Sequence, residues 1–194
     1  LFTIPLDYNK GTPHTWLGST AYDGWFPWTD NAATVNTSGS STIWPQPVLC
    51  DIVFDADGSL ILSFFDRNGH QSGWFNYQPH NTDLKFTVIG GDLLRAYYNP
   101  TTCSYELESN GKEGPSSTKA ATAGAGNSQG PGGGEFYFKD CYRCTGVNGT
   151  GNPHEENVQG GIAMALGSGE VAVAVIDPVQ FDSGGLTWYN NTTG

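Results

Sequence analysis

Four oxygen-bearing side chains beside glycine turns have the chemistry of a calcium site. Asp55 and Asp57 stand before one glycine, and Asp66 and Asn68 stand before another. Carboxylate, amide and backbone oxygens gathered in a turn are the ligands that Ca²⁺ prefers. The EF-hand pattern fails, because the twelfth position from Asp55 is not Glu and no helix is expected on either side. Both turns are compatible with calcium, but Asp-Gly is common in hairpin turns and needs no metal there.

The cysteines indicate either disulfides or a redox or metal site. They are Cys50, Cys103, Cys141 and Cys144. A thioredoxin-like site would open a helix, which the glycines after Cys144 do not favour, and zinc would require further ligands. An even count in an oxidising compartment favours disulfides. The most economical pairing joins Cys141 to Cys144 and Cys50 to Cys103, among the pairings that the sequence permits.

One dense cluster of titratable residues raises the question of catalysis. His154, Glu155 and Glu156 are consecutive, and Asp177 or Asp182 could supply a partner carboxylate for glycoside hydrolysis. Such a pair would require a cleft and a second catalytic group. Polar residues in a Gly/Pro-containing loop more often cap turns, and no Gly-x-Ser-x-Gly motif is present. We therefore expect the chain not to be an enzyme.

Glycosylation motifs place the chain outside the cytosol. Asn36, Asn148, Asn190 and Asn191 each begin an Asn-x-Ser/Thr sequon. The chain starts at Leu1 without Met or a signal peptide, which is typical of a mature or cut product, or of a segment of a larger protein. Together with the even cysteine count, these features predict an extracellular or cell-surface location.

Aromatic residues crowd the N-terminal part of the chain, where Trp16, Trp25 and Trp28 lie near Tyr22 and Phe26. If exposed, these rings could stack on sugars or anchor a protein interface. If buried, they would pack the core. The three tryptophans are our candidates for a ligand or interface contact.

The charge balance argues against two classes of partner. The net charge is −11, with only 8 Lys plus Arg, and charged residues make up 14% of the chain. Phosphate backbones and anionic lipids bind through Lys and Arg clusters, which are missing here. No apolar run approaches the ~20 residues that span a bilayer. We therefore expect no nucleic acid partner and no membrane insertion.

Short strands separated by glycine turns predict an all-β fold. Val48–Phe54 and Leu60–Phe65 flank Asp-Gly as a hairpin, and Gly160–Met164 with Glu170–Ile176 form another. Turns every eight to twelve residues are typical of sandwiches, barrels and propellers. Further strands are expected at residues 84–89, 92–98, 104–107, 135–138 and 186–189.

The two hairpins share one plan, which favours a β-propeller-like domain over residues 1–194, partial or open. The sequence Asp66-Arg-Asn-Gly69 reads as a second tight turn. Residues 110–134 are mostly Gly, Ser, Ala, Thr and Pro, with almost nothing to bury. They are expected to form a surface loop or an internal linker.

Ordered blocks along the chain carry a family resemblance. The main ones are residues 44–55, 65–71, 91–96, 160–163, 167–171, 183–185 and 188–194. In this order they resemble a propeller-like region of large bacterial cell-surface proteins that carry Cna-B-type, serine-aspartate-repeat B-like domains. The resemblance implies an adhesin or surface coat and brings no catalytic residues. The Gly-rich insert and Cys141-Tyr-Arg-Cys144 depart from the pattern.

These features predict an extracellular structural or adhesive protein, a glycosylated subunit or segment of a surface layer, sheath or filament. Its expected partners are other copies of itself or neighbouring surface proteins, and possible ligands include glycans. The alternatives are a carbohydrate-binding module that uses exposed Trp and Tyr, and a secreted glycoside hydrolase.

Overall fold

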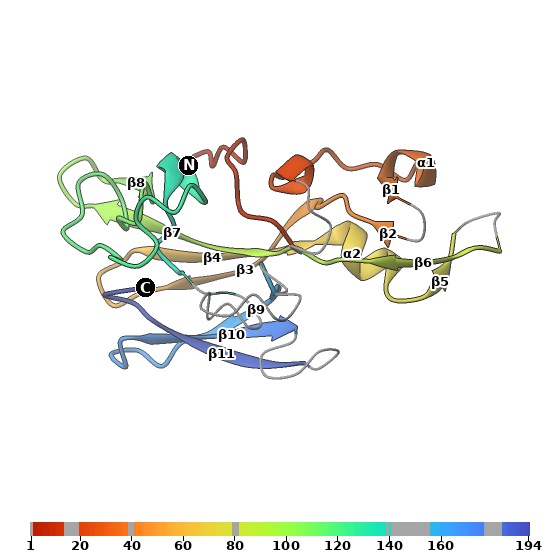
Figure 1. Cartoon of the computed structure of the whole chain (residues 1–194). Coiled ribbons are helices and arrows are strands. Elements are labelled where there is room, and N and C mark those ends of the chain that lie inside the picture. Colours follow the sequence, from red (N-terminus) through yellow and green to blue (C-terminus); the bar gives the residue numbers. More distant parts are fainter. Residues whose placement is uncertain are drawn as a thin grey trace.

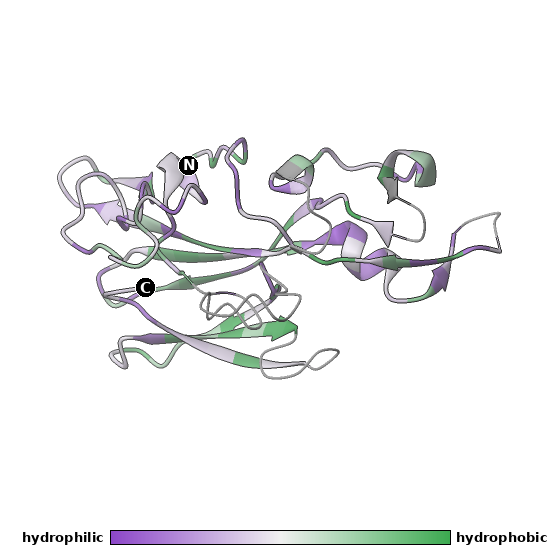
Figure 2. Ribbon diagram, viewed as in Figure 1, coloured by the Kyte–Doolittle hydropathy of each residue, from purple (hydrophilic) through white to green (hydrophobic). Residues whose placement is uncertain are grey.

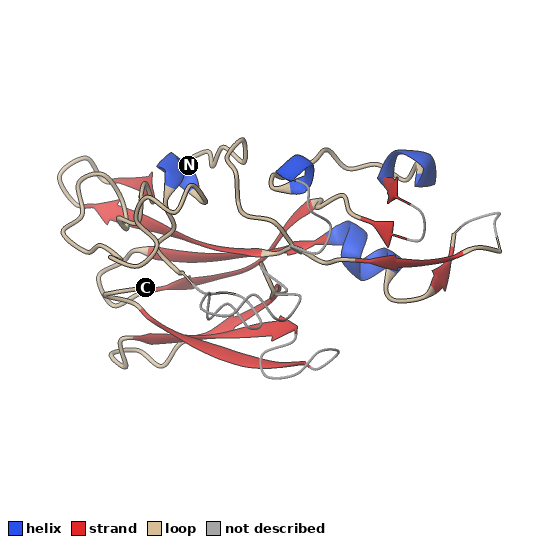
Figure 3. Cartoon of the chain, in the orientation of Figure 1, coloured by secondary structure: helices blue, strands red, loops and turns tan. Residues whose placement is uncertain are grey.

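The strands of the chain form three separate sheets, and helices are few and short (Figures 1 and 3). The computed structural model describes residues 2–13, 20–38, 41–78, 82–138, 140, 156–176 and 184–194. The predicted all-β class is confirmed. The helices of the described part are η2 (Thr20–Tyr22), α1 (Ala32–Val35), α2 (Arg67–Ser72) and η3 (Pro131–Gly133). None of them is long and apolar enough to cross a membrane.

The central sheet is antiparallel, in the order β3-β4-β7-β8. Its strands are β3 (Pro47–Phe54), β4 (Leu60–Asp66), β7 (Asp92–Asn99) and β8 (Ser104–Leu107). The predicted hairpin of β3 and β4 is confirmed, with Phe54 opposite Leu60. Gly58 adopts a φ of 85° in the turn, the left-handed conformation that Asp-Gly favours.

The second sheet is antiparallel and packs on one face of the central sheet (Figure 1). It has the order β11-β10-β9, with β9 (Val158–Ala163), β10 (Glu170–Ile176) and β11 (Gly184–Asn190). The predicted hairpin of β9 and β10 is also confirmed. Ile61 and Leu93 of the central sheet share a core with Val158, Val173 and Val175 of the second sheet.

The opposite face of the central sheet is covered by the N-terminal segment. Leu60, Leu62 and Phe64 alternate with the residues that face the second sheet, and they pack against Leu6 and Trp25. β4 is therefore buried on both faces, which explains its nearly continuous apolar sequence (Figure 2). Each such side chain contributes about 1.5–3 kcal/mol through burial.

A third, smaller sheet lies beside these layers, in the order β1-β2-β6-β5. It consists of β1 (Asn36–Ser38), β2 (Ser41–Thr42), β5 (Asn76–Tyr77) and β6 (Leu84–Thr87), and its β2–β6 pair is parallel. The two predicted hairpins thus lie in two sheets that face each other. The described residues show no closed ring of blades.

Two predicted local structures are wrong. Residues 135–138 are buried but follow a bend instead of a strand, because their backbone hydrogen bonds go to the preceding loop and to a carboxylate. Asp66-Arg-Asn-Gly69 is no hairpin turn but the start of α2. Asp66 caps this helix by accepting a hydrogen bond from the Asn68 backbone N–H.

The Gly-rich segment 110–134 is an irregular loop that packs against the rest of the domain. Ala121 enters the core between the sheets. The Gly130 N–H donates to the Asn9 carbonyl at 2.6 Å, which ties the loop to the N-terminal segment. The loop therefore brings its own polar residues into the interior.

Candidate functional sites

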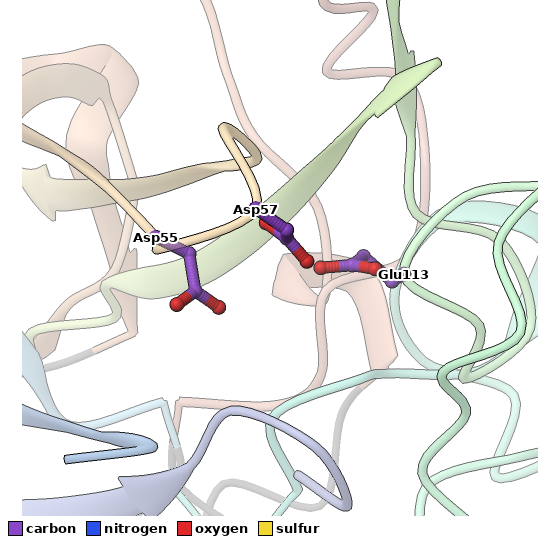
Figure 4. A group of neighbouring side chains, drawn as sticks. All are labelled: Asp55, Asp57 and Glu113. Carbon is purple, nitrogen blue, oxygen red and sulfur yellow. The ribbon is translucent and has the colours of Figure 1, made fainter. Parts of the chain in front are cut away.

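The first group of acidic residues, which we call the turn cluster, consists of Asp55, Asp57 and Glu113 (Figure 4). Asp55 and Asp57 come from the β3–β4 turn, and Glu113 comes from the loop after β8. One carboxylate oxygen of each lies within 4.8 Å of the others. The sequence pattern found the two aspartates but missed Glu113, which joins them only in the folded chain.

Two cations of the chain already neutralise the turn cluster. The Arg95 guanidinium is fully buried on β7 and pairs with Asp55 and Glu113. Lys119 pairs with Asp57 and lies 3.5 Å from Asp55 and 3.6 Å from Glu113. These side chains supply the positive charge that a calcium ion would bring, so the turn cluster is an ion-pair network.

The other predicted calcium ligands are not brought to this turn. Asp66 is the last residue of β4, at the end away from this turn, and Asn68 lies in the first turn of α2. Asp66 Oδ1 accepts the backbone N–H groups of Gln46 and Asn68, each at 2.9 Å. Burial raises the pKa of Asp66 to about 6. This aspartate therefore organises backbone, and the four predicted ligands form no common site.

A second group, which we call the buried cluster, was not predicted as a metal site. It consists of Glu135, Asp140 and Glu156, all buried, with one oxygen of each within 4.8 Å of the others. Glu135 follows the Gly-rich loop, and Glu156 precedes β9. The Asn157 N–H donates to the Asp140 carbonyl at 2.8 Å, which holds the two segments together.

Burial raises the pKa values of carboxyl groups in the buried cluster. Among the described residues, Lys10 pairs with Glu156, with its Nζ 3.9 Å from Glu156 Oε2. Burial and the charges of Asp140 and Asp92 raise the pKa of Glu135 to about 10. Burial and the charge of Asp140 also raise the pKa of Glu156. Three close carboxylates in a dry interior favour proton uptake or a bound cation over full ionisation.

Glycines allow the chain to close around this cluster. A Cβ atom at Gly11, whose φ is 106°, would lie 2.1 Å from Glu156 Oε1. A Cβ atom at Gly130 would lie 2.9 Å from Glu135 Cγ. Gly130, one of the glycines that suggested a linker, therefore allows close packing against a buried carboxylate. Sequence reasoning singled out Glu156 for catalysis, but it lies in the interior, 1% exposed. His154, Glu155, Asp177 and Asp182 lie outside the described residues.

The predicted Cys50–Cys103 pairing is not formed, and both thiols are free. Cys50 lies in β3 beside Gly160 of β9, whereas Cys103 lies in the β7–β8 turn. The strand register puts these positions at opposite ends of the central sheet. Cys141 and Cys144 lie outside the described residues, so their pairing stays a prediction.

Asn191 is not available to a glycan in the folded chain. It is buried, and its Oδ1 accepts the Tyr137 hydroxyl at 2.9 Å. Asn190 is exposed and stays a predicted glycosylation site. Asn36 lies in β1, its side chain is not among those described, and Asn148 lies outside the described residues.

The predicted aromatic contacts divide between core and surface. Trp25 is partly buried and packs against the core, with its ring 6.2 Å from that of Phe64, so its predicted ligand contact stays a prediction. Trp28 is 61% exposed. Trp16 lies outside the described residues. Trp25 and Trp28 thus differ in how much of the side chain is exposed, and the local sequence composition does not predict this difference.

An apolar stripe follows β3, the edge strand of the central sheet. Leu49, Ile52 and Phe54 are 45%, 45% and 59% exposed. Trp28 lies at the start of the strand, where its indole N–H donates to the Pro47 carbonyl at 2.8 Å. We call these four exposed residues, Trp28 included, the β3 stripe. The sequence predicted this strand but gave no sign that one of its faces is uncovered.

A polar pocket of about 480 Å³ lies near β5 and α2. It is lined by polar side chains that include Asp30, Asn68, Gln71 and Asn76. Tyr77, 68% exposed, forms part of its wall. Such a combination of hydroxyl, amide and ring is suited to a small polar ligand.

Comparison with known proteins finds distant relatives. The chain is similar to Colossin-A of Dictyostelium discoideum, with 28% identity over 196 residues and 99% of this chain. It is also similar to Colossin-B and Colossin-C of the same organism, each 28% identical, over 91% and 92% of this chain. No protein-family model and no solved structure matches. The chain spans only 2%, 4% and 15% of the lengths of these three relatives.

Proposed function

We propose that this chain is an extracellular structural or adhesive module that packs against other copies of itself or neighbouring surface proteins. The observation that carries the proposal is the β3 stripe. Monomeric proteins seldom leave adjacent large apolar side chains uncovered, and such stripes mark interaction surfaces. A non-enzymatic role, a glycosylated surface and the relation to propeller regions of bacterial surface proteins belong to the same proposal.

The shape of β3 favours side-chain packing over strand addition. The register between β3 and β4 shifts between Leu49 and Asp51, which is a bulge in the edge strand. Bulges and charged residues protect sheet edges against pairing with another chain. The stripe is therefore suited to cover an apolar surface of a partner without extending the sheet.

The coverage of the relatives supports a modular role. Nearly the entire chain aligns with a small part of three proteins, and that part ranges from 2% to 15% of their lengths. A unit that occurs in proteins of such different sizes is expected to act by packing and display within a larger assembly.

Sedimentation velocity over a range of protein concentrations tests the packing surface. The wild-type chain is expected to self-associate, and the Ile52→Ser, Phe54→Ser variant is expected to stay monomeric. Leu166→Ser is the matched control, because Leu166 is 79% exposed in the β9–β10 turn, away from the stripe. Binding of the wild-type chain to intact cells is measured alongside. The proposal is overturned if the wild-type chain stays monomeric at every concentration and also fails to bind cells.

The location is tested on the natural protein. Its intact mass, measured with and without deglycosylation, and its accessibility to protease on intact cells should both indicate a surface glycoprotein. An unglycosylated product that protease reaches only after lysis would contradict the extracellular location.

A second candidate function, carbohydrate binding, is favoured by the polar pocket beside Tyr77. Exposed rings stack on sugars, and amide and carboxylate groups bind their hydroxyls. Glycan-array binding that is lost in Tyr77→Ala and retained in Trp188→Ala, an exposed tryptophan on β11, would support this function. Equal binding by both variants would refute a role for the pocket.

A further inference from the structure

We propose that the polar pocket near β5 and α2 binds a single sugar ring, with Asn68 Nδ2 and Gln78 Nε2 as hydrogen-bond donors to its hydroxyl oxygens. This inference rests on the second candidate function, carbohydrate binding, and deepens it, because it assigns the size of the ligand and two of the groups that hold it.

The walls of the pocket come from α1, α2 and the third sheet, which lie near one another in Figure 1. Asn76 of β5 is the cross-strand partner of Lys85 of β6, so both side chains lie on the face of the sheet that lines the pocket. The volume of about 480 Å³ is in the lower half of the range of about 300–1,000 Å³ for small-molecule sites. This size suits one sugar ring better than a long oligosaccharide.

Two amide nitrogens that line the pocket have no hydrogen-bond partner in the part of the chain that the structure describes. Asn68 is 4% exposed, and its Oδ1 accepts the Ser72 hydroxyl at 3.3 Å, which leaves Nδ2 as the unpartnered atom of this amide. Gln78 Nε2 is buried in the same way. Buried donors in native proteins almost always have partners. The two amides therefore call for a ligand that brings acceptor oxygens.

The other groups of the pocket favour hydroxyls over an anion. The described lining carries charges of both signs, from Asp30 and Lys85. Asp30 Oδ1 also accepts the Arg67 guanidinium at 2.5 Å. An anion offers only acceptors and would be repelled by Asp30, whereas a hydroxyl both accepts and donates. A sugar ring carries several hydroxyls at fixed spacing, so it can accept from the two amides and donate to oxygens of the wall.

Ligand-observed NMR titration of the full chain tests the inference with defined probes. These are the methyl glycopyranosides of glucose, galactose, mannose and N-acetylglucosamine. At least one of them is expected to bind the wild type. Deoxy analogues of that glycoside, each lacking one hydroxyl, then locate the oxygens that the pocket recognises.

Gln78→Met removes one donor and keeps the length of the side chain, and Asn68→Ala removes the other. Each variant is expected to bind the glycoside about tenfold more weakly or worse, because a ligand oxygen loses its donor in a buried site. Gln129→Met is the matched control, since Gln129 is also half-buried but lies in the Gly-rich loop, and it should bind as the wild type does. Thermal unfolding checks that each variant is folded.

A double-mutant cycle separates direct contact from a general loss of structure. The deoxy analogue that lacks the hydroxyl bound by Gln78 should bind the wild type more weakly, but should bind Gln78→Met about as well as the parent glycoside does. Either variant that is folded and binds as tightly as the wild type overturns the inference. A glycan array that binds while no methyl glycoside does would overturn the single-ring site and leave carbohydrate binding standing, whereas a negative array would refute both.

Discussion

The turn cluster and the buried cluster each gather three carboxylates, yet they differ in how their charge is balanced. In the turn cluster, Arg95 and Lys119 contact the carboxylates directly. In the buried cluster, the ion pair that the described residues form is the one between Lys10 and Glu156, with 3.9 Å between Nζ and Oε2. The same residue types thus form a network of direct ion pairs in one place and a buried group with raised carboxyl pKa values in the other.

The difference shows why acidic residues alone do not identify a metal site. Asp55 and Asp57 match a calcium loop better in sequence, but the fold gives them a guanidinium and an ammonium. Glu135 and Glu156 match no motif, but the fold buries them close together, which raises the pKa of both carboxyl groups. The decisive information is which basic residues lie within reach, and that depends on the tertiary structure.

The largest expected effect comes from removing the central cation of the turn cluster. Arg95→Met should lower the free energy of unfolding by about 3–5 kcal/mol, because Asp55 and Glu113 would lose their partner in the interior. Tyr137 would also lose the guanidinium that donates to its hydroxyl at 2.9 Å. Urea unfolding measures the loss.

Arg67→Met is a suitable control, because Arg67 pairs with Asp30 at the surface and stacks on Trp28. It should cost far less than Arg95→Met. Equal losses in the two variants would show that the Arg95 network contributes no more than a surface pair.

The pH dependence of stability tests the interior carboxylates next to the clusters. Burial and the charge of Asp92 raise the pKa of Glu108 to about 8, above its ordinary value of 4.5. The folded chain therefore keeps a proton that the unfolded chain releases, and stability is lost as the pH rises from 4.5 towards 8. For one such group the slope is at most roughly 1.4 kcal/mol per pH unit.

Chelator-treated protein should thus unfold at lower urea concentration at pH 8 than at pH 5, a range that includes the raised pKa of Glu108. Glu108→Gln should flatten this dependence. It should also lower stability, because Glu108 accepts the backbone N–H groups of both Arg95 and Phe136. Glu170→Gln, at an exposed position, should leave the slope unchanged. A rise in stability over this range would contradict the assignment.

The sequence predicted elements well where local pattern decides them. β8 occurs at Ser104–Leu107 as expected, and β3 and β4 form the expected hairpin around Asp-Gly. The sequence pattern gave wrong predictions where contacts between residues far apart in the sequence determine the local structure. Residues 135–138 have the sequence pattern of a strand but form a bend, because the Phe136 N–H donates a hydrogen bond to the Glu108 carboxylate.

The candidate site was harder to predict than the fold. Glu135 lies next to a segment whose composition offers almost nothing to bury, and Asp140 is separated from Glu156 by 15 residues in the sequence. The close approach of Gly11 to Glu156 is a signal that only the three-dimensional arrangement gives. Glycine-rich composition predicts a loop, but the packing that the glycines permit depends on their partners.

A smaller effect is expected from closing the space beside Glu156. Gly11→Ala should cost about 1–3 kcal/mol, from a positive φ and from the Cβ contact with Glu156 Oε1. Gly133→Ala is the matched control, because Gly133 has a φ of 82° and open space around its Cβ position. Urea unfolding measures both losses, and Gly133→Ala should lose less stability than Gly11→Ala. If both variants lose the same stability, the contact between Gly11 and Glu156 does not support the buried cluster.

The smallest effect separates the two cations of the turn cluster. Lys119 is 28% exposed, whereas Arg95 is fully buried. Water screens the Lys119 pairs, so Lys119→Ala should cost about 0.2–1 kcal/mol, and the loss should shrink at high salt. Urea unfolding at low and high ionic strength measures both values. A salt-independent loss as large as that of Arg95→Met would mean that Lys119 belongs to the buried network. The three carboxylates of the turn cluster would then need both cations for their neutralisation.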